Sequence, residues 1–317
     1  MNPFKLHVIE VIAAFSMVVV LGVFLKRWKI LKQDDGPYFA RLLTKVILPA
    51  VIFSQLSVHR VNSEQLLLVL SMFIAGCVSL ALAWMAGRII NAPRPTIGAL
   101  MITSAFGSSS LLGYPLVKYV FPDSPQAMTD VVLLSELGVG LPIFTICPLV
   151  AMHFGTSKMS MGAIWRTFLD YLRSPIFISV VLGVGASFLG IPVEHPSIAP
   201  FYQALGMING ALVFFASLIL GLQLKVKSVR GILPLFLISV VVQIVLQPFM
   251  AIGCANIFNL GLEQKQVLVF ICLMPSAVLG PVFATQYDSD GETAATLAFA
   301  NIVSSAVLIP LMFTVLV

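Results

Sequence analysis

The stretch Phe106 to Pro115, FGSSSLLGYP, interrupts a long apolar segment with two glycines, three serines and a proline. A helix in lipid must satisfy its own backbone hydrogen bonds, so a broken helix at membrane depth needs protein or a water-filled cavity around it. Transport proteins use broken membrane helices to direct half-helix ends at a substrate. The stretch therefore predicts one half of a binding site, with a second broken helix elsewhere in the chain.

The composition is that of an integral membrane protein. Hydrophobic residues make up 59% of the 317 residues and charged residues 10%, with a mean hydropathy of +1.03. Soluble domains carry about 25% charged residues. The net charge is +5, and the basic residues fall in short clusters between apolar runs, which indicates membrane topology and not a nucleic-acid-binding face. We therefore expect a lipid bilayer around the chain and no nucleic-acid partner.

A membrane-spanning helix needs about 20 residues, and on that measure the sequence predicts an all-α protein with ten transmembrane helices. The first is predicted to span the membrane, because its apolar run is too long for a cleaved signal. The predicted segments are residues 8–25, 38–58, 65–87, 96–121, 128–152, 175–191, 198–224, 231–257, 266–286 and 293–316.

The charges of the loops predict the orientation of the chain. The loops after segments one, three, five and seven hold twelve lysines and arginines, and those on the opposite side hold four. Basic loops stay on the cytoplasmic side of a membrane. We therefore expect a multi-pass protein of the cell (inner or plasma) membrane, with both termini outside the cytoplasm.

The two halves of the sequence show matching interruptions. Five segments in each half place the halves in opposite membrane orientations, as an inverted repeat requires. Segment four is predicted to break at Gly113 to Pro115, and segment nine carries Met274-Pro275 and then Gly280-Pro281. Interrupted segments at corresponding positions indicate a transport site.

Three further stretches have a distinctive pattern: KVILPAVIFSQL at Lys45 to Leu56, SPIFISVVLGVGASFLGIP at Ser174 to Pro192, and MPSAVLGPVFATQYD at Met274 to Asp288. They resemble the auxin efflux carrier family, in its bacterial branch, which includes proteins proposed to move malate or malonate. The resemblance covers essentially the whole chain.

This resemblance implies a crossover fold related to that of the bile acid/sodium symporters, in which broken helices four and nine cross. Scaffold helices would occupy residues 1–60 and 175–225. Transport-domain helices would occupy residues 61–154 and 226–317, with a cytoplasmic loop at 155–174. The family often has asparagine and glycine before the proline of segment four, where this chain has Ser108 and Ser110. Hydroxyls lack the paired donor and acceptor of an amide. The resemblance therefore predicts the fold of this chain better than it predicts the substrate.

The broken helices predict a substrate site at their crossing. A half-helix N-terminus presents unpaired N–H groups and a partial positive charge, which with nearby hydroxyls could hold a carboxylate. The alternative is that glycine and serine only permit close helix packing. The candidate residues are Ser108, Ser109, Ser110, Gly113, Tyr114, Pro115, Met274, Pro275, Ser276 and Asn301.

Polar residues inside other segments add further candidates. Glu136 lies about eight residues into segment five, roughly 12 Å below its start, where a carboxyl group usually lines a pathway or a proton relay. It is the candidate for proton coupling, and a structural hydrogen bond is the alternative. Gln243 and Gln247 are expected to bond across helices. The GxxxG match at Gly206 to Gly210 predicts either close packing or a homodimer face on the scaffold helices.

The sequence thus favours a secondary active transporter of the elevator type for a small organic anion such as a carboxylate. It lacks HExxH, GxSxG and a mid-membrane histidine, so an enzyme is not expected, and no residues are proposed as metal ligands. It also lacks a GxxxxGK loop for ATP, so no cofactor is expected. A gradient of H⁺ or Na⁺ would then supply the energy. The alternative is a channel or a membrane sensor of the substrate built on a transporter fold.

Overall fold

We describe a computed structural model over residues 3–32, 35–58, 62–155, 161–190, 195–223, 232–277 and 279–316. Every regular element formed by these residues is a helix. They also contain one isolated antiparallel β-bridge, and they form no β-strand. Within the same residues, five helices are long and apolar enough to cross a membrane. They are Ser63–Ile89, Pro125–Phe154, Ala199–Ala216, Leu233–Ile257 and Gly291–Leu316. The prediction of an all-helical membrane protein is confirmed.

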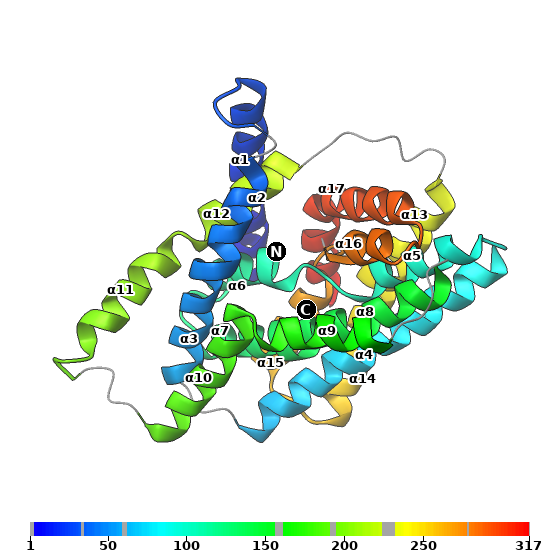
Figure 1. Ribbon diagram of the computed structural model, residues 1–317. Helices are drawn as coiled ribbons and strands as arrows, with labels where there is room; N and C mark the ends of the chain where they lie inside the picture. Colours follow the sequence, from blue (N-terminus) through cyan, green and yellow to red (C-terminus); the bar gives the residue numbers. More distant parts are fainter. Residues whose placement is uncertain are drawn as a thin grey trace. The chain divides into compact units, whose positions relative to one another are not determined.

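The helices shown in Figure 1 form two compact units, which we describe separately. Unit 1 comprises Met1–Gln65, Ser110–Val132 and Leu172–Leu224. Unit 2 comprises Leu66–Ser109, Leu133–Tyr171 and Lys225–Val317. These units are defined by contacts, whereas the predicted scaffold and transport domains are defined by which helices move together. The division into scaffold and transport domains stays a prediction.

Unit 1 is built around α3, which packs against α10 and α11, and around the pair α1 and α12 (Figure 1). Gly183 permits the close approach of α10 to α3, because a Cβ atom there would lie 2.9 Å from Leu56 Cβ. Its helices are α1 (Pro3–Arg27), α2 (Gly36–Leu42), α3 (Leu48–Val58), α6 (Tyr114–Val120), α7 (Pro125–Leu133), α10 (Pro175–Leu189), α11 (Ala199–Gly210) and α12 (Leu212–Gln223), and the π-helical turn η2 (Leu43–Ile47) joins α2 to α3.

Unit 2 is built around α5, which packs against α8, α16 and α17. Its α-helices are α4 (Ser63–Ile89), α5 (Arg94–Ala105), α8 (Leu141–Phe154), α9 (Met161–Leu172), α13 (Leu233–Val240), α14 (Gln247–Ile257), α15 (Leu262–Cys272), α16 (Leu279–Gln286) and α17 (Gly291–Leu316). Three π-helical turns also occur in or next to it: η3 (Ser109–Gly113), η4 (Leu134–Gly140) and η6 (Val241–Leu246).

The break in segment four lies earlier than predicted. The chain leaves the helix at Phe106 to Ser108, whereas Gly113 is helical and Pro115 stands in the first turn of α6. The π-helical turn η3 runs directly into α6, so Pro115 stands inside a continuous helix. Membrane helices tolerate proline where local π-helical adjustments satisfy the freed backbone groups. The prediction that Gly113 to Pro115 form the break is therefore wrong.

A helix also forms inside the predicted loop at residues 155–174. The segment Met161–Leu172, MGAIWRTFLDYL, is α9. Its larger apolar residues recur three and four positions apart, the spacing of an amphipathic helix. This helix was not predicted from the sequence, because it is too short to span a membrane.

Asp290 connects the N-termini of two helices of unit 2. Its Oδ1 accepts a hydrogen bond from Thr293 N (3.0 Å), which caps α17, and its Oδ2 accepts one from Thr96 Oγ1 of α5 (2.8 Å). Burial raises the pKa of Asp290, but the hydrogen bonds from Thr293 and Thr96 outweigh it, so the pKa lies below its usual value.

Asp290→Ala is expected to lower the free energy of unfolding at pH 7 by about 1–2 kcal/mol, the usual effect of removing a helix cap. Because the folded-state pKa is depressed, the carboxylate stabilises the fold above the ordinary aspartate pKa of about 3.9. That stabilisation is lost as the pH falls through the lower folded-state value.

Thermal unfolding of detergent-purified protein between about pH 7 and pH 3 measures this effect, and the gap between wild type and variant should narrow toward the acidic end. Asp290→Asn keeps a good capping residue and should fall between them. Equal stability of wild type and Asp290→Ala at pH 7 would contradict the role of this cap.

Candidate functional site

Two helix breaks pair with each other inside unit 2. The break after α5 and the break after α15 run antiparallel, and Gly107 is bridged to Ser276. Two backbone hydrogen bonds flank this bridge, from Ser108 N to Pro275 O (2.7 Å) and from Ala277 N to Phe106 O (2.9 Å). Each break thus satisfies part of the backbone of the other, as a membrane environment requires.

Gly107 is the point of closest approach between the two breaks. A Cβ atom on this residue would lie 2.7 Å from the carbonyl oxygen of Met274 and 3.0 Å from Met274 Cβ. Real Cβ atoms do not approach backbone oxygen so closely, so the pairing requires glycine at this position. This is the physical reason for one glycine of the FGSSSLLGYP stretch.

Buried side chains take up carbonyl groups that the broken helices leave without helical partners. Gln247 Nε2 donates to Ala105 O at the end of α5 (2.8 Å), and Gln243 Nε2 donates to Met274 O (2.9 Å). Both glutamine side chains are fully buried. The prediction that these amides bond across helices is confirmed, and their partners are the helix breaks themselves.

Ser276 lies at the centre of this network. Its Oγ lies within hydrogen-bonding distance of Thr103 O and 3.1 Å from Gln243 Oε1, and both of these atoms are acceptors. A hydroxyl has one proton, so Ser276 donates to one of them at a time. It must then accept from Asn301, whose Nδ2 lies 2.6 Å from Ser276 Oγ. The hydrogen-bond pattern therefore fixes the orientation of the Asn301 amide.

Three buried oxygens of unit 2 have no hydrogen-bond partner among the described residues. They are Gln247 Oε1, Asn301 Oδ1 and Ser104 Oγ. The amide nitrogens of Gln247 and Asn301 donate into the network, which fixes the position of each amide oxygen. An amide oxygen can only accept a hydrogen bond. A buried polar atom without a partner costs about 1–3 kcal/mol. The two amide oxygens suit a hydrogen-bond donor or a cation and would repel an anion, whereas the Ser104 hydroxyl can donate as well as accept.

The structure brings together the predicted residues Ser108, Met274, Pro275, Ser276 and Asn301. The side chains of Ser276 and Asn301 are committed to the network described above. Ser108 is different, because only its backbone N–H is engaged and its hydroxyl makes no hydrogen bond to the described residues. Ser108 is therefore the member of this group whose side chain is available to a ligand.

The other predicted residues take different places. Ser109 Oγ lies 2.7 Å from Ser135 Oγ, so these two hydroxyls are hydrogen-bonded to each other. Ser110, Gly113, Tyr114 and Pro115 belong to unit 1. The sequence did not point to Ser104, Ser135 and Ser239, because single serines are common in membrane helices and carry no spacing signal.

Glu136 is buried, with 3% of its surface exposed, and lies in the π-helical turn η4. Its backbone carbonyl accepts a hydrogen bond from the hydroxyl of Tyr171 on α9 (2.8 Å). Burial and the negative charge of Glu136 both raise the pKa of Tyr171, so the phenol keeps the proton that it donates. Tyr171 also stacks on Phe144 of α8, with ring centroids 4.6 Å apart. Through these two contacts, α9 stabilises the π-helical turn that carries Glu136.

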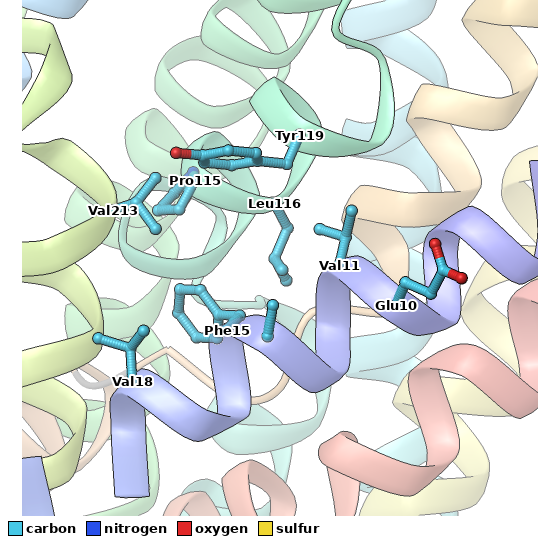
Figure 2. Close-up of a pocket in the computed structure, with 9 residues that line it drawn as sticks. Glu10, Val11, Phe15, Val18, Pro115, Leu116, Tyr119 and Val213 are labelled. Atoms are coloured by element: carbon cyan, nitrogen blue, oxygen red, sulfur yellow. The ribbon is translucent and has the colours of Figure 1, made fainter. Parts of the chain in front are cut away.

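Unit 1 contains an apolar pocket of about 380 Å³. Figure 2 shows Phe15 and Leu116 inside it and Glu10 at its edge. Pro115, one of the predicted site residues, also lines this pocket. The lining comes from α1, α6 and α12.

Apolar helices with paired breaks, buried amides at those breaks and a buried carboxyl group are characteristic of a membrane transporter. The chain belongs to the auxin efflux carrier-like family described as "Membrane transport protein", whose sequence profile matches residues 7–313. The resemblance predicted from the sequence is confirmed, and the protein is a multi-pass membrane transporter and not an enzyme.

Two archaeal relatives align over nearly their whole length. An uncharacterized transporter from Methanocaldococcus jannaschii is 24% identical over 308 residues, which cover 95% of this chain and 96% of the relative. An uncharacterized transporter from Methanothermobacter thermautotrophicus is 25% identical over 311 residues, which cover 97% of this chain and 98% of the relative.

Gly107→Ala is expected to lower the free energy of unfolding by about 1–3 kcal/mol, because the new methyl group would overlap the Met274 carbonyl and force the breaks apart. The matched control is Gly253→Ala in α14, where a Cβ atom meets nothing within 4 Å. Removing a helical glycine there should leave stability unchanged or raise it by up to about 1 kcal/mol.

Thermal unfolding of the two purified variants in detergent distinguishes these outcomes. If Gly107→Ala were as stable as Gly253→Ala, the close pairing of the two breaks would be wrong.

Proposed function

We propose that this protein is a secondary active transporter that moves a small organic anion, such as a carboxylate, and binds it at the paired breaks of segments four and nine. The observation that carries the proposal is the antiparallel pairing of Gly107 with Ser276 between two interrupted helices. Broken helices pointing at a common place are the usual substrate site of a secondary transporter. The proposal includes the ten spans and the inverted repeat predicted from the sequence.

The carboxylate would bind where the second halves of the broken helices begin. These halves start at Ser109 and at Leu279, and their first N–H groups have no partner within the helix. Such N-termini favour a negative charge. The hydroxyl of Ser108, immediately before the first of them, would donate a further hydrogen bond to the substrate.

A different group would fill the place next to the unpaired oxygens. Gln247 Oε1 and Asn301 Oδ1 repel a carboxylate but attract a cation or a hydrogen-bond donor. Sodium sites in transporters are built from neutral backbone carbonyl oxygens at unwound helices, and a side-chain amide oxygen is a ligand of the same chemical type. We therefore infer that these oxygens receive either a coupled Na⁺ or a donor group on the substrate.

Glu136 is the proposed site for coupling to protons. Burial disfavours the charged form of a carboxyl group, so a proton would bind and leave as the access of water changes. The π-helical turn around Glu136 supports this role, because such turns occur frequently at functional sites. Proton and sodium coupling therefore involve different residues of unit 2, and mutations can separate them.

An elevator-type cycle is the proposed mechanism of transport. In this cycle the predicted transport domain, residues 61–154 and 226–317, would slide against the predicted scaffold, residues 1–60 and 175–225. The paired breaks would then face each side of the membrane in turn. The proposal also includes termini outside the cytoplasm and a homodimer through scaffold helices, which rest on the sequence alone.

Purified protein in liposomes loaded with dicarboxylates should exchange internal for external substrate, with uptake stimulated from the opposite side. Ser108→Ala should raise KM about tenfold or more, because a hydrogen bond to a charged group is lost. The matched control is Ser79→Ala, since Ser79 lies buried in α4 of the same unit and its hydroxyl bonds Ala75 of its own helix.

Three results would contradict the proposal in different ways. Flux without stimulation from the opposite side would indicate a channel, and binding without flux would indicate a sensor. An unchanged KM in Ser108→Ala, with transport intact, would remove this serine from the substrate site.

Glu136→Gln is expected to flatten the dependence of transport on pH, because the side chain can no longer take up a proton. The control is Asp130→Asn, a second buried carboxyl group of the same segment, which accepts hydrogen bonds from Gln65 and Gln126. Uptake measured between about pH 5 and pH 8 should keep its profile in this control. An unchanged profile in Glu136→Gln, with uptake that requires Na⁺, would replace proton coupling by sodium coupling.

A further inference from the structure

A polar pocket of about 520 Å³ lies at one end of unit 2, at the other end of α5 from the paired helix breaks. It is formed where α4 ends, α5 begins and α8 ends. The residues that line it are Trp84, Arg88, Asn91, Ala92, Arg94, Ile97, His153 and Phe154. The pocket therefore carries two arginines and a histidine but no acidic residue in its lining.

The two arginines of this pocket are available to an anion. Neither Arg88 nor Arg94 forms a salt bridge with a described residue. Arg88 lies over the ring of Trp84, with its guanidinium carbon 5.9 Å from the ring centroid, and Arg94 Nη2 donates to His153 O (2.6 Å). Asp290 on the neighbouring loop is already hydrogen-bonded to α5 and α17, as described above. Two positive charges thus face a pocket whose lining contains no acidic residue.

Exposed apolar side chains adjoin the same pocket. Ile89 is 76% exposed and Met85 is 50% exposed on the last turns of α4, and Trp84 is also exposed. Tryptophan prefers the interface between lipid chains and headgroups. The helix α4 is one of those apolar enough to span the membrane, and the pocket lies at its end. Charge for a phosphate and apolar surface for acyl chains therefore occur side by side.

We propose that this pocket binds the phosphate group of an anionic membrane lipid. The guanidinium groups of Arg88 and Arg94 bind the phosphate, with Asn91 as a further donor, and the acyl chains lie along Met85 and Ile89. Arginine suits this role because its planar fork pairs with phosphate through two hydrogen bonds. Basic pockets between membrane helices are known to recognise lipid headgroups. The site is independent of the paired helix breaks.

Quenching of Trp84 fluorescence by phosphatidylglycerol with brominated acyl chains tests the proposal directly. The protein carries Trp28→Phe and Trp165→Phe, so that Trp84 is the only tryptophan, and it is titrated in detergent micelles. Saturable quenching by brominated phosphatidylglycerol, and weaker quenching by brominated phosphatidylcholine, is the expected result. Arg88→Gln/Arg94→Gln should weaken binding about 30-fold, and Arg88→Gln alone about fivefold, the usual effect of one basic side chain near an anionic surface.

The matched control removes two exposed positive charges from unit 1, in Arg41→Gln/Lys45→Gln, and should change binding less than about twofold. If the double variant at the pocket does not fold, the single Arg88→Gln variant decides, because the Arg88 side chain lies over the Trp84 ring and makes no hydrogen bond or salt bridge to the described residues. Equal quenching by the two lipids, or unchanged binding in Arg88→Gln, overturns the proposal. Inorganic phosphate that displaces the lipid at equal concentration would assign the pocket to a soluble phosphate instead.

Discussion

The requirement that every backbone polar group find a partner away from water governs this structure. Two helices stop inside unit 2, and their extended ends pair at Gly107 and Ser276. Gln243 and Gln247 then donate hydrogen bonds to two carbonyl groups that the pairing does not engage. A buried amide on a neighbouring helix is costly unless it is hydrogen-bonded, so the breaks and the glutamines depend on each other.

That dependence has a chemical consequence. Each glutamine and Asn301 uses its N–H groups to complete the network, so the spare capacity of the site consists of oxygens. In the proposed site, the oxygens would attract a cation and the helix N-termini an anion, so two ligands would be separated by charge. Coupling an anionic substrate to a cation would then rest on backbone geometry and neutral side chains.

The all-helical membrane fold could be predicted from the sequence, because a helix that spans a lipid bilayer requires a long apolar run. The auxin efflux carrier-like family and the second break at Met274-Pro275 could be predicted in the same way. The position of the first break could not be predicted, since Gly113 to Pro115 have the stronger local signal for a turn. The deciding contact at Gly107 is with a residue far away in the chain. The helix α9 was not predicted, because only segments of about 20 residues, long enough to span a membrane, were counted as helices.

The sequence by itself determined that this is a helical membrane protein with two interrupted helices, because hydrophobicity, charge and helix-breaking residues are properties of single segments. Only the tertiary structure decided which side chains form hydrogen bonds at the two breaks. Ser276 and Asn301 are internal partners, whereas the Ser108 hydroxyl and the oxygens of Gln247 and Asn301 are left for a ligand. The reason is that one proton or one lone pair serves one partner at a time, and the assignment of partners depends on residues that meet only in the folded chain.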